Sequence, residues 1–145
     1  MNVWLLKDFV KEISSELAVA NGQDYYLEQS FSKETLFYDE KTKTIDAYKC
    51  KGAYTLTTVN DTIRYWYTQE IPLFDGPFSR YDIPGLVLSV ESKKKITYAT
   101  KIEFFDKKLI LDTVPKNAVF VTKQELENIR LEARKPKSYT DEYGN

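Results

Sequence analysis

The chain has 145 residues, enough for one domain to bury a core without disulfides or metals. Its formal net charge of −1 provides no positive field to neutralise phosphates, which argues against nucleic acid as a partner. It contains no histidine and one cysteine, so it cannot by itself build a Ser-His-Asp or Cys-His nucleophile, an intrachain disulfide or a thiolate zinc cluster. We therefore expect no cofactor and no metal.

The remaining composition favours a globular β protein. Aromatic residues make up 14% of the chain, eleven of them tyrosine, and only five residues are glycine. No stretch approaches the roughly 18 apolar residues that a membrane-spanning helix requires. Residues Met1 to Leu6 lack a basic segment followed by an apolar one, so no signal peptide is visible in this chain. The single cysteine, Cys50, is expected to be a small buried residue on a strand.

The first segments predict a short helix followed by a hairpin. Val3, Leu6, Val10 and Ile13 recur at helical spacing, so we expect a helix that ends near Ser14. The pair Asn21-Gly22 then predicts a tight hairpin turn, because both central residues of a type I′ turn need positive φ. Residues 16–20 and 24–30 are the expected paired strands.

The middle of the chain predicts another pair of strands. A short strand is expected over 34–39, and the polar residues 40–43 are expected to end it. Clear alternation of apolar and polar residues with a period of two follows over 47–59. This alternation predicts one buried face and one solvated face. The pair Asn60-Asp61 predicts a turn, and 62–71 the returning strand.

The stretch Pro72 to Gly85 cannot be a central strand, because its three prolines remove three ladder donors. We expect a long loop, with Pro84-Gly85 in a type II turn where glycine supplies positive φ. Structureless loops of this length are uncommon in compact domains and are often functional.

The last third predicts a three-stranded meander and a helix. The expected strands cover 86–91, 96–105 and 109–114. Thr122 and Glu125 form a capping-box pattern, which predicts a helix to about Arg134. The whole chain is thus expected to be mainly β: a curved antiparallel sheet, an open half-barrel or bowl of about seven or eight strands with short terminal helices. We expect one domain over 1–135 and a disordered tail over 136–145.

Three segments together resemble the GLPGLI family of Bacteroidota proteins. Residues Lys43 to Ala53 are similar to the family stretch TKTIGGYKCQKA, and Tyr65 to Pro72 to AWFTxEIP. A third match joins Asp75 to Phe78 with Asp82 to Val87, similar to DGPxxFxGLPGLI, although Asp82-Ile83 replaces Gly-Leu and Val87 replaces Ile. The resemblance covers about residues 16–105. Its motif residues here are Asp75, Gly76, Pro77, Pro84, Gly85 and Leu86.

The resemblance implies a curved antiparallel β domain, export to the periplasm or outer envelope, and no assigned activity. It also implies that the chain corresponds to the C-terminal part of such a protein. A related bowl-shaped domain accompanies some bacterial glycan-cleaving amidases, which suggests an accessory role by analogy.

The favoured function is non-enzymatic: an envelope-associated binding or assembly module with an unknown protein or glycan partner. Aromatic anchors dominate many interfaces, so the candidate contact residues lie in or near the proline-rich loop. They are Trp66, Phe74, Asp75, Phe78 and Tyr81.

Two alternatives use other residues. A carrier could hold a hydrophobic ligand in the curved sheet if the following apolar side chains shared one face: Tyr65, Tyr67, Leu88, Tyr98 and Phe104. A hydrolase could use a pair of carboxylates drawn from Glu70, Asp75 and Asp82, since glycoside hydrolysis needs no histidine.

Overall fold

The computed structural model describes residues 4–77, 80 and 82–136. The chain divides into two compact units, one formed by Met1–Ser30 with Ile110–Asn145 and the other by Phe31–Leu109. Each unit contains its own sheet, and nearly all strand pairs are antiparallel. The prediction of a mainly antiparallel β fold is therefore confirmed, with the strands shared between two sheets. Almost all of the predicted tail, residues 137–145, lies outside the described residues.

The first unit is a four-stranded sheet with one helix. Its strands lie in the order β1-β2-β3-β9, and β9 joins β3 in parallel. Helix α1 packs on this sheet through Leu126, which is 2% exposed and contacts Ala18 and Leu27. The bounds of the elements are Trp4–Asp8 for β1, Ile13–Ala20 for β2, Gln23–Ser30 for β3, Val119–Phe120 for β9 and Lys123–Arg134 for α1.

The predicted N-terminal helix is wrong, because the same residues form β1, a turn and the start of β2. The Asp8 carboxylate accepts hydrogen bonds from the backbone N–H groups of Val10 (3.0 Å) and Lys11 (2.9 Å), and Glu12 has a φ of 54°. An aspartate that binds backbone groups a few residues ahead favours a turn over a helix. Val10, counted in the apolar helical face, is 95% exposed.

The other two predictions in this unit are confirmed. Asn21 and Gly22 have φ values of 50° and 74°, and Ala20 pairs with Gln23 across the two-residue turn. Thr122 caps α1 by accepting from the Glu125 N–H, while the Glu125 side chain accepts from the Thr122 N–H. This capping box fixes the start of the helix at Lys123, so two residues separate it from β9.

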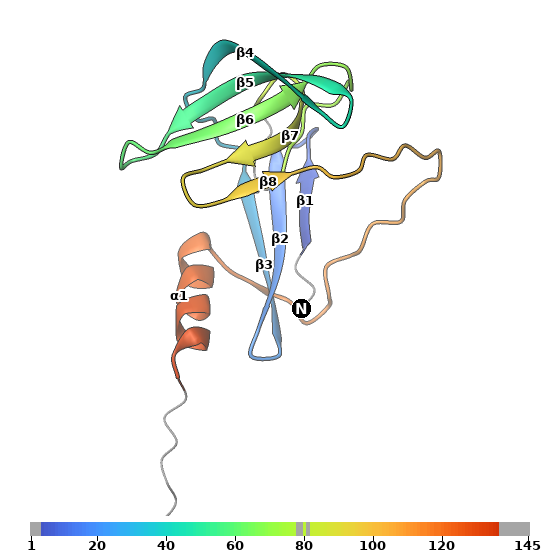
Figure 1. Cartoon of the computed structure of the whole chain (residues 1–145). Coiled ribbons are helices and arrows are strands. Elements are labelled where there is room, and N and C mark those ends of the chain that lie inside the picture. Colours follow the sequence, from blue (N-terminus) through green and yellow to red (C-terminus); the bar gives the residue numbers. More distant parts are fainter. Residues whose placement is uncertain (1–3, 78–79, 81, 137–145) are drawn as a thin grey trace, which may run out of the picture. The chain divides into compact units, whose positions relative to one another are not determined.

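The second unit is a five-stranded antiparallel sheet in the order β4-β5-β6-β7-β8 (Figure 1). All five strands follow their chain order in the sheet, so each pairs with the next, and the proline-rich loop connects β6 to β7. The bounds are Phe37–Ile45 for β4, Tyr48–Leu56 for β5, Thr62–Thr68 for β6, Leu86–Glu91 for β7 and Ile96–Tyr98 for β8.

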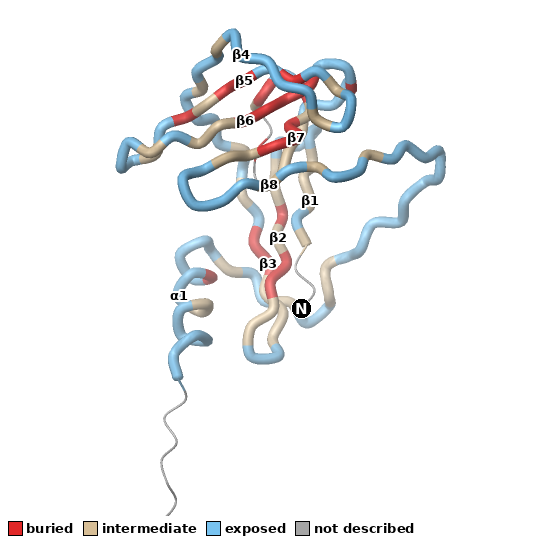
Figure 2. Tube along the Cα trace, viewed as in Figure 1, coloured by how far each residue is buried: buried red, intermediate tan, exposed pale blue. Residues whose placement is uncertain are grey.

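Both faces of this sheet are buried at its centre, which corrects the expectation of one solvated face. The Tyr65 face carries the core cluster of Ala53, Tyr65, Tyr67, Ile83 and Val87. The Trp66 face carries Cys50, Trp66 and Leu88, covered in part by Ala99 and Ile102. Figure 2 shows the resulting buried stretches along β5, β6 and β7. Central strands with two covered faces lose the simple alternation of apolar and polar residues.

A β-bulge in the centre of the sheet changes which side chains share a face. Trp66 pairs with Ser89 and Tyr67 pairs with Val87, so Leu88 is the extra residue of β7. An extra residue places two successive side chains on the same side of a sheet. Leu88 and Ser89 therefore both lie on the Trp66 face.

Three other strand predictions need correction. Strand β4 begins at Phe37 and continues through 40–43 to Ile45, turning into β5 at Asp46 and Ala47, which both have positive φ. Strand β8 ends at Tyr98, and 109–114 form no strand. Most of the large apolar residues of these last segments are exposed, as in Phe104 (69%) and Ile110 (97%), although Ile102 is half-buried against the Trp66 face. The alternation there is not matched by a partner strand.

The loop between β6 and β7 has no regular structure in its described part, as predicted, but its final turn differs. Gly85 does not have positive φ, so Pro84-Gly85 is not the expected type II turn. Instead Gly85 fits a narrow space: an added Cβ would lie 2.5 Å from the Thr68 carbonyl oxygen and 2.8 Å from Tyr67 Cδ2. The close approach of two backbones, rather than φ, requires glycine here.

The substitution Gly85→Ala should therefore lower the free energy of unfolding by about 1–3 kcal/mol, because a backbone carbonyl cannot move aside as a flexible side chain can. Urea unfolding measures the change. Thr58→Ala, at an exposed position of the turn between β5 and β6, is the control. Equal stability of Gly85→Ala and the wild-type chain would contradict the close approach.

Candidate functional site

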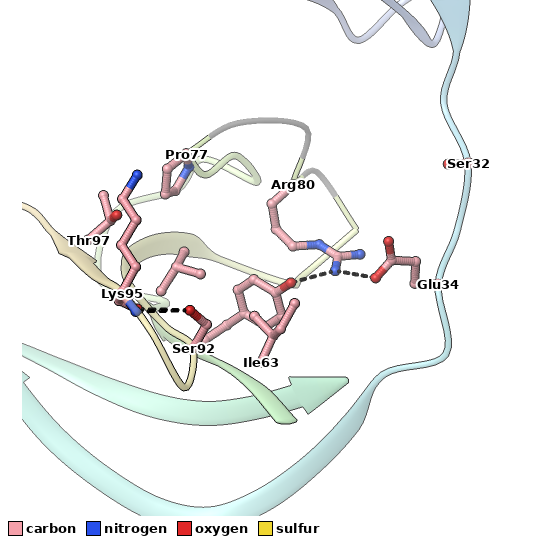
Figure 3. A pocket seen from close by; sticks show the side chains of 10 residues that line it. Ser32, Glu34, Ile63, Pro77, Arg80, Ser92, Lys95 and Thr97 are labelled. Atoms are coloured by element: carbon pink, nitrogen blue, oxygen red, sulfur yellow. Dashed lines mark hydrogen bonds and ion pairs between the residues drawn. The ribbon is translucent and has the colours of Figure 1, made fainter. Parts of the chain in front are cut away.

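The candidate site is a pocket on the Tyr65 face of the second unit, beside the loop between β6 and β7 (Figure 3). Its volume is about 270 Å³. Ile63, Tyr65, Pro77 and Val90 provide apolar walls. The polar groups come from β8, the β7–β8 turn, the segment before β4 and the loop itself: Ser32, Glu34, Arg80, Ser92, Lys95 and Thr97. We call it the Arg80 pocket.

Arg80 anchors the loop to the sheet through several contacts. Its guanidinium Nε donates to Oδ1 of the Asp82 carboxylate at 2.7 Å, and its Nη2 donates to the same oxygen. Its Nη1 donates to the Tyr65 hydroxyl and to Glu34, both at 3.2 Å. The cation also lies over the Tyr65 ring, 4.9 Å from its centre. One arginine thus connects the loop, β6 and the segment before β4.

The ion pair of Arg80 and Asp82 is buried, with exposed side-chain fractions of 8% and 9%. Burial alone lowers the pKa of Arg80, but the hydrogen bonds to Asp82 and Tyr65 outweigh it and raise the pKa. The guanidinium therefore stays charged at any pH at which the protein folds. Glu34 is 59% exposed, so its ion pair with Arg80 is screened by water and contributes little to stability.

The loop residues that resemble the GLPGLI motif hold the backbone in place. The Asp75 carbonyl accepts from the Val87 N–H at 2.9 Å, and the Asp75 carboxylate accepts from the Gly76 N–H at 2.7 Å. A Cβ on Gly76 would lie 2.8 Å from Val87 Cβ, so glycine lets the loop pack against β7. Pro84 provides a carbonyl that accepts from Gln69 at 3.3 Å.

Among the predicted contact residues that the structure describes, Trp66 does not share the exposed surface of the loop. Trp66 is 7% exposed and lies on the opposite face of the sheet, where its indole N–H donates to Glu91 at 3.1 Å. Phe74 is 64% exposed on the loop. Phe78 and Tyr81 lie outside the described residues, so their part in a contact surface stays a prediction.

The three candidate carboxylates each have separate local contacts. Glu70 accepts from the Lys49 N–H at 3.0 Å, Asp75 binds its neighbour Gly76, and Asp82 pairs with Arg80. These are contacts typical of turns and ion pairs. They give the hydrolase alternative no geometric support.

The predicted carrier residues do not share one face. Tyr65 and Tyr67 belong to the Tyr65 face, whereas Leu88 packs with Trp66 on the other. Tyr98 and Phe104 are 63% and 69% exposed. The bulge at Leu88 and the end of β8 at Tyr98 explain why the alternation did not continue across the strands.

Cys50 is fully buried on the Trp66 face, as expected. Burial is the main cause that raises the pKa of its thiol, so it stays protonated and unreactive. Among the residues that the structure describes, no cluster of three acidic or cysteine side chains could hold a metal ion. Within the same residues, no helix has the length and apolar character needed to cross a membrane.

Sequence reasoning did not single out Arg80, Glu34 or the role of Tyr65. The available signal was the spacing Arg80-x-Asp82 in a loop with few other charges, which permits a local ion pair. Its burial and its contact with Tyr65, fifteen residues earlier, depend on the loop folding back over the sheet.

Replacing Arg80 by methionine should lower the free energy of unfolding by about 3–5 kcal/mol, because the buried Asp82 carboxylate loses its cation. The double variant Arg80→Met/Asp82→Leu should recover most of this loss, since no buried charge remains. Arg134→Met, at an exposed position, is the control. A single variant within about 1 kcal/mol of wild type in urea unfolding would show that the pair does not anchor the loop.

A search of curated proteins gave no match. Two solved structures, described as PNGF-II in a C2 and in a P21 space group, share the fold, with TM-scores of 0.71 and 0.75 and identities of 21% and 20%. They cover 88% and 91% of this chain, and the chain spans only 24% and 25% of theirs. A family model described as "N-glycanase peptide, N-terminal domain" matches residues 13–131, most of the sequence, so this chain belongs to that family.

Proposed function

We propose that this chain is a non-catalytic module that works beside an enzyme acting on glycans, and that the loop between β6 and β7 is its contact surface for the catalytic domain. The support is twofold. The family is named for the N-terminal domain of an N-glycanase peptide, and the chain corresponds to about a quarter of the PNGF-II chains. A module of this extent fits an accessory part attached to or assembled with a larger catalytic part.

The observation that carries the proposal is a pair of exposed apolar side chains on an anchored loop. Leu73 and Phe74 are 54% and 64% exposed. Their neighbours are fixed: Ile71 is 3% exposed and accepts a hydrogen bond from the Leu73 N–H, and Asp75 binds the start of β7. Exposed apolar groups on a held backbone lose little entropy when a partner covers them, which favours association.

The Arg80 pocket adds a polar part to this surface. Pro77 and Arg80 of the same loop line it together with Glu34 and Lys95, so the pocket carries charges of both signs. Interfaces typically combine apolar anchors with a polar rim that sets orientation. The loop contributes residues of both kinds, which fits its proposed role as a protein contact surface.

The double variant Leu73→Ser/Phe74→Ser should weaken binding at least about tenfold, because both anchors are lost. The measurement is calorimetric titration of the chain against N-glycanase-type catalytic domains from the same genome, each made without its own N-terminal domain. Val59→Ser is the matched control, since Val59 is 75% exposed in the turn between β5 and β6. If no such domain binds, or if the loop variant binds as tightly as wild type, the loop is not the contact surface.

The proposed location is the periplasm or outer envelope, on the strength of the GLPGLI-like segments in this sequence. We expect the product of the native gene to be found in the envelope fraction of the cells, in a form processed from a larger precursor. Intact mass spectrometry of fractionated cells tests this. An unprocessed cytosolic product that begins at Met1 would contradict export.

A further inference from the structure

A second pocket lies on the other side of the five-stranded sheet, on the Trp66 face, and has a volume of about 530 Å³. The ends of β4 and β7, strand β8 and the residues after it provide its lining. The residues that matter for its chemistry are Lys43, Ser89, Glu91, Ile96, Tyr98 and Thr100. We call it the Ser89 pocket. None of the loop residues discussed above contributes to it.

Ser89 is the unusual residue of this lining. It is 1% exposed, and its hydroxyl oxygen has no hydrogen-bond partner among the described residues. A buried hydroxyl without a partner has lost its hydrogen bonds to water and gained none in return, so such groups are rare unless something else binds them. The β-bulge explains its position, because the extra residue Leu88 turns Ser89 toward the Trp66 face.

The charges of the pocket are largely balanced. Lys43 Nζ donates to Glu91 Oε1 at 3.1 Å, and the Trp66 indole N–H donates to the same oxygen at 3.1 Å. The Lys43 cation also lies over the Trp66 ring, 5.4 Å from its centre. Asp46 adds a carboxylate only at the exposed rim, where water screens it. The inner part of the pocket thus has no excess charge to attract an ion.

Apolar surface lies next to these polar groups. Tyr98 and Ile96 are 63% and 62% exposed, although both belong to a strand of the sheet. The ring of Tyr98 can stack against a flat apolar face, as aromatic side chains do at ligand sites. A ligand for this pocket therefore needs an apolar face together with groups that both donate and accept hydrogen bonds.

We infer that the Ser89 pocket binds a neutral polyhydroxylated ring, the chemistry of a single sugar unit. A hydroxyl of the ring both donates and accepts, so it can satisfy Ser89 Oγ whichever way that hydroxyl turns. Further hydroxyls meet Glu91, Lys43 and Thr100, and the C–H face of the ring stacks on Tyr98. A charged ligand would have to compete with the existing pair of Lys43 and Glu91.

The test is a two-dimensional ¹⁵N NMR titration of the whole chain with glucose, mannose, fucose and N-acetylglucosamine. The two tryptophans give separate indole N–H signals. At least one sugar should shift the Trp66 indole signal, which reports on Glu91, and the amide signals of β7 and β8. The Trp4 indole signal should stay unchanged, because Trp4 lies in the other unit.

Ser89→Ala and Tyr98→Ala should each weaken this binding about tenfold or more, since one loses the buried hydroxyl and the other the stacking ring. Ser89→Ala should be as stable as wild type or more stable, because the unsatisfied group is gone, so lost binding cannot reflect unfolding. Thr97→Val is the matched control: it lies on the same strand but lines the Arg80 pocket.

The inference is overturned if no sugar shifts the Trp66 indole, if Ser89→Ala binds as well as wild type, or if only arginine or acetate, used as charged probes, causes the shifts. Sugar binding by the isolated chain does not require a catalytic partner. Failure of this titration therefore leaves the loop proposal intact, and failure of the loop proposal leaves this one intact.

Discussion

The five-stranded sheet depends on one constraint: its central strand β6 is buried on both faces. Four successive residues of this strand are at most 7% exposed: Tyr65, Trp66, Tyr67 and Thr68. Because successive side chains point to opposite faces, other residues must cover the strand on both faces. On one face the loop before β7 supplies it, with Ile83 completing the cluster. On the other face the residues after β8 supply part of it. The long loop therefore has a structural role, because without it the apolar residues of the Tyr65 face would be exposed to water.

The means by which the loop stays in place follow from that constraint. A backbone that crosses a sheet at close range needs glycine where it approaches, as at Gly85 and Gly76, and partners for its buried polar groups. Arg80 and Asp82 provide those partners as an ion pair that also binds Tyr65. These anchors leave Leu73 and Phe74 exposed on a fixed backbone. The features that hold the loop thus also create the surface proposed for partner binding.

The two pockets lie on opposite faces of the same sheet and differ in whether the buried polar side chains that line them have hydrogen-bond partners. In the Arg80 pocket, the guanidinium already has protein partners on several sides. In the Ser89 pocket, a buried hydroxyl has none among the described residues, while the nearby charges are paired. The buried Asp82 Oδ2 beside Arg80 likewise has no partner among the described residues, but Asp82 is not part of the Arg80 pocket lining. A pocket whose own lining includes a buried, unpartnered hydroxyl is suited to a ligand that completes its hydrogen bonds.

The sequence by itself determined the elements whose cause is local. The turn at Asn21-Gly22, the capping box at Thr122 and the strand pair around Asn60 depend on a few adjacent residues, and the structure has all of them. Only the tertiary structure decided what depends on distant contacts. The spacing of apolar residues at the N-terminus predicted a helix, but Asp8 stabilises a turn there and β1 pairs with β2. The face of Leu88 and Ser89 was set by a bulge, and the role of Arg80 by a loop folding over Tyr65. The bulge and the Arg80 contact both depend on pairing between segments that are far apart in the chain. The period-two alternation within one segment does not show which distant segment will pair with it.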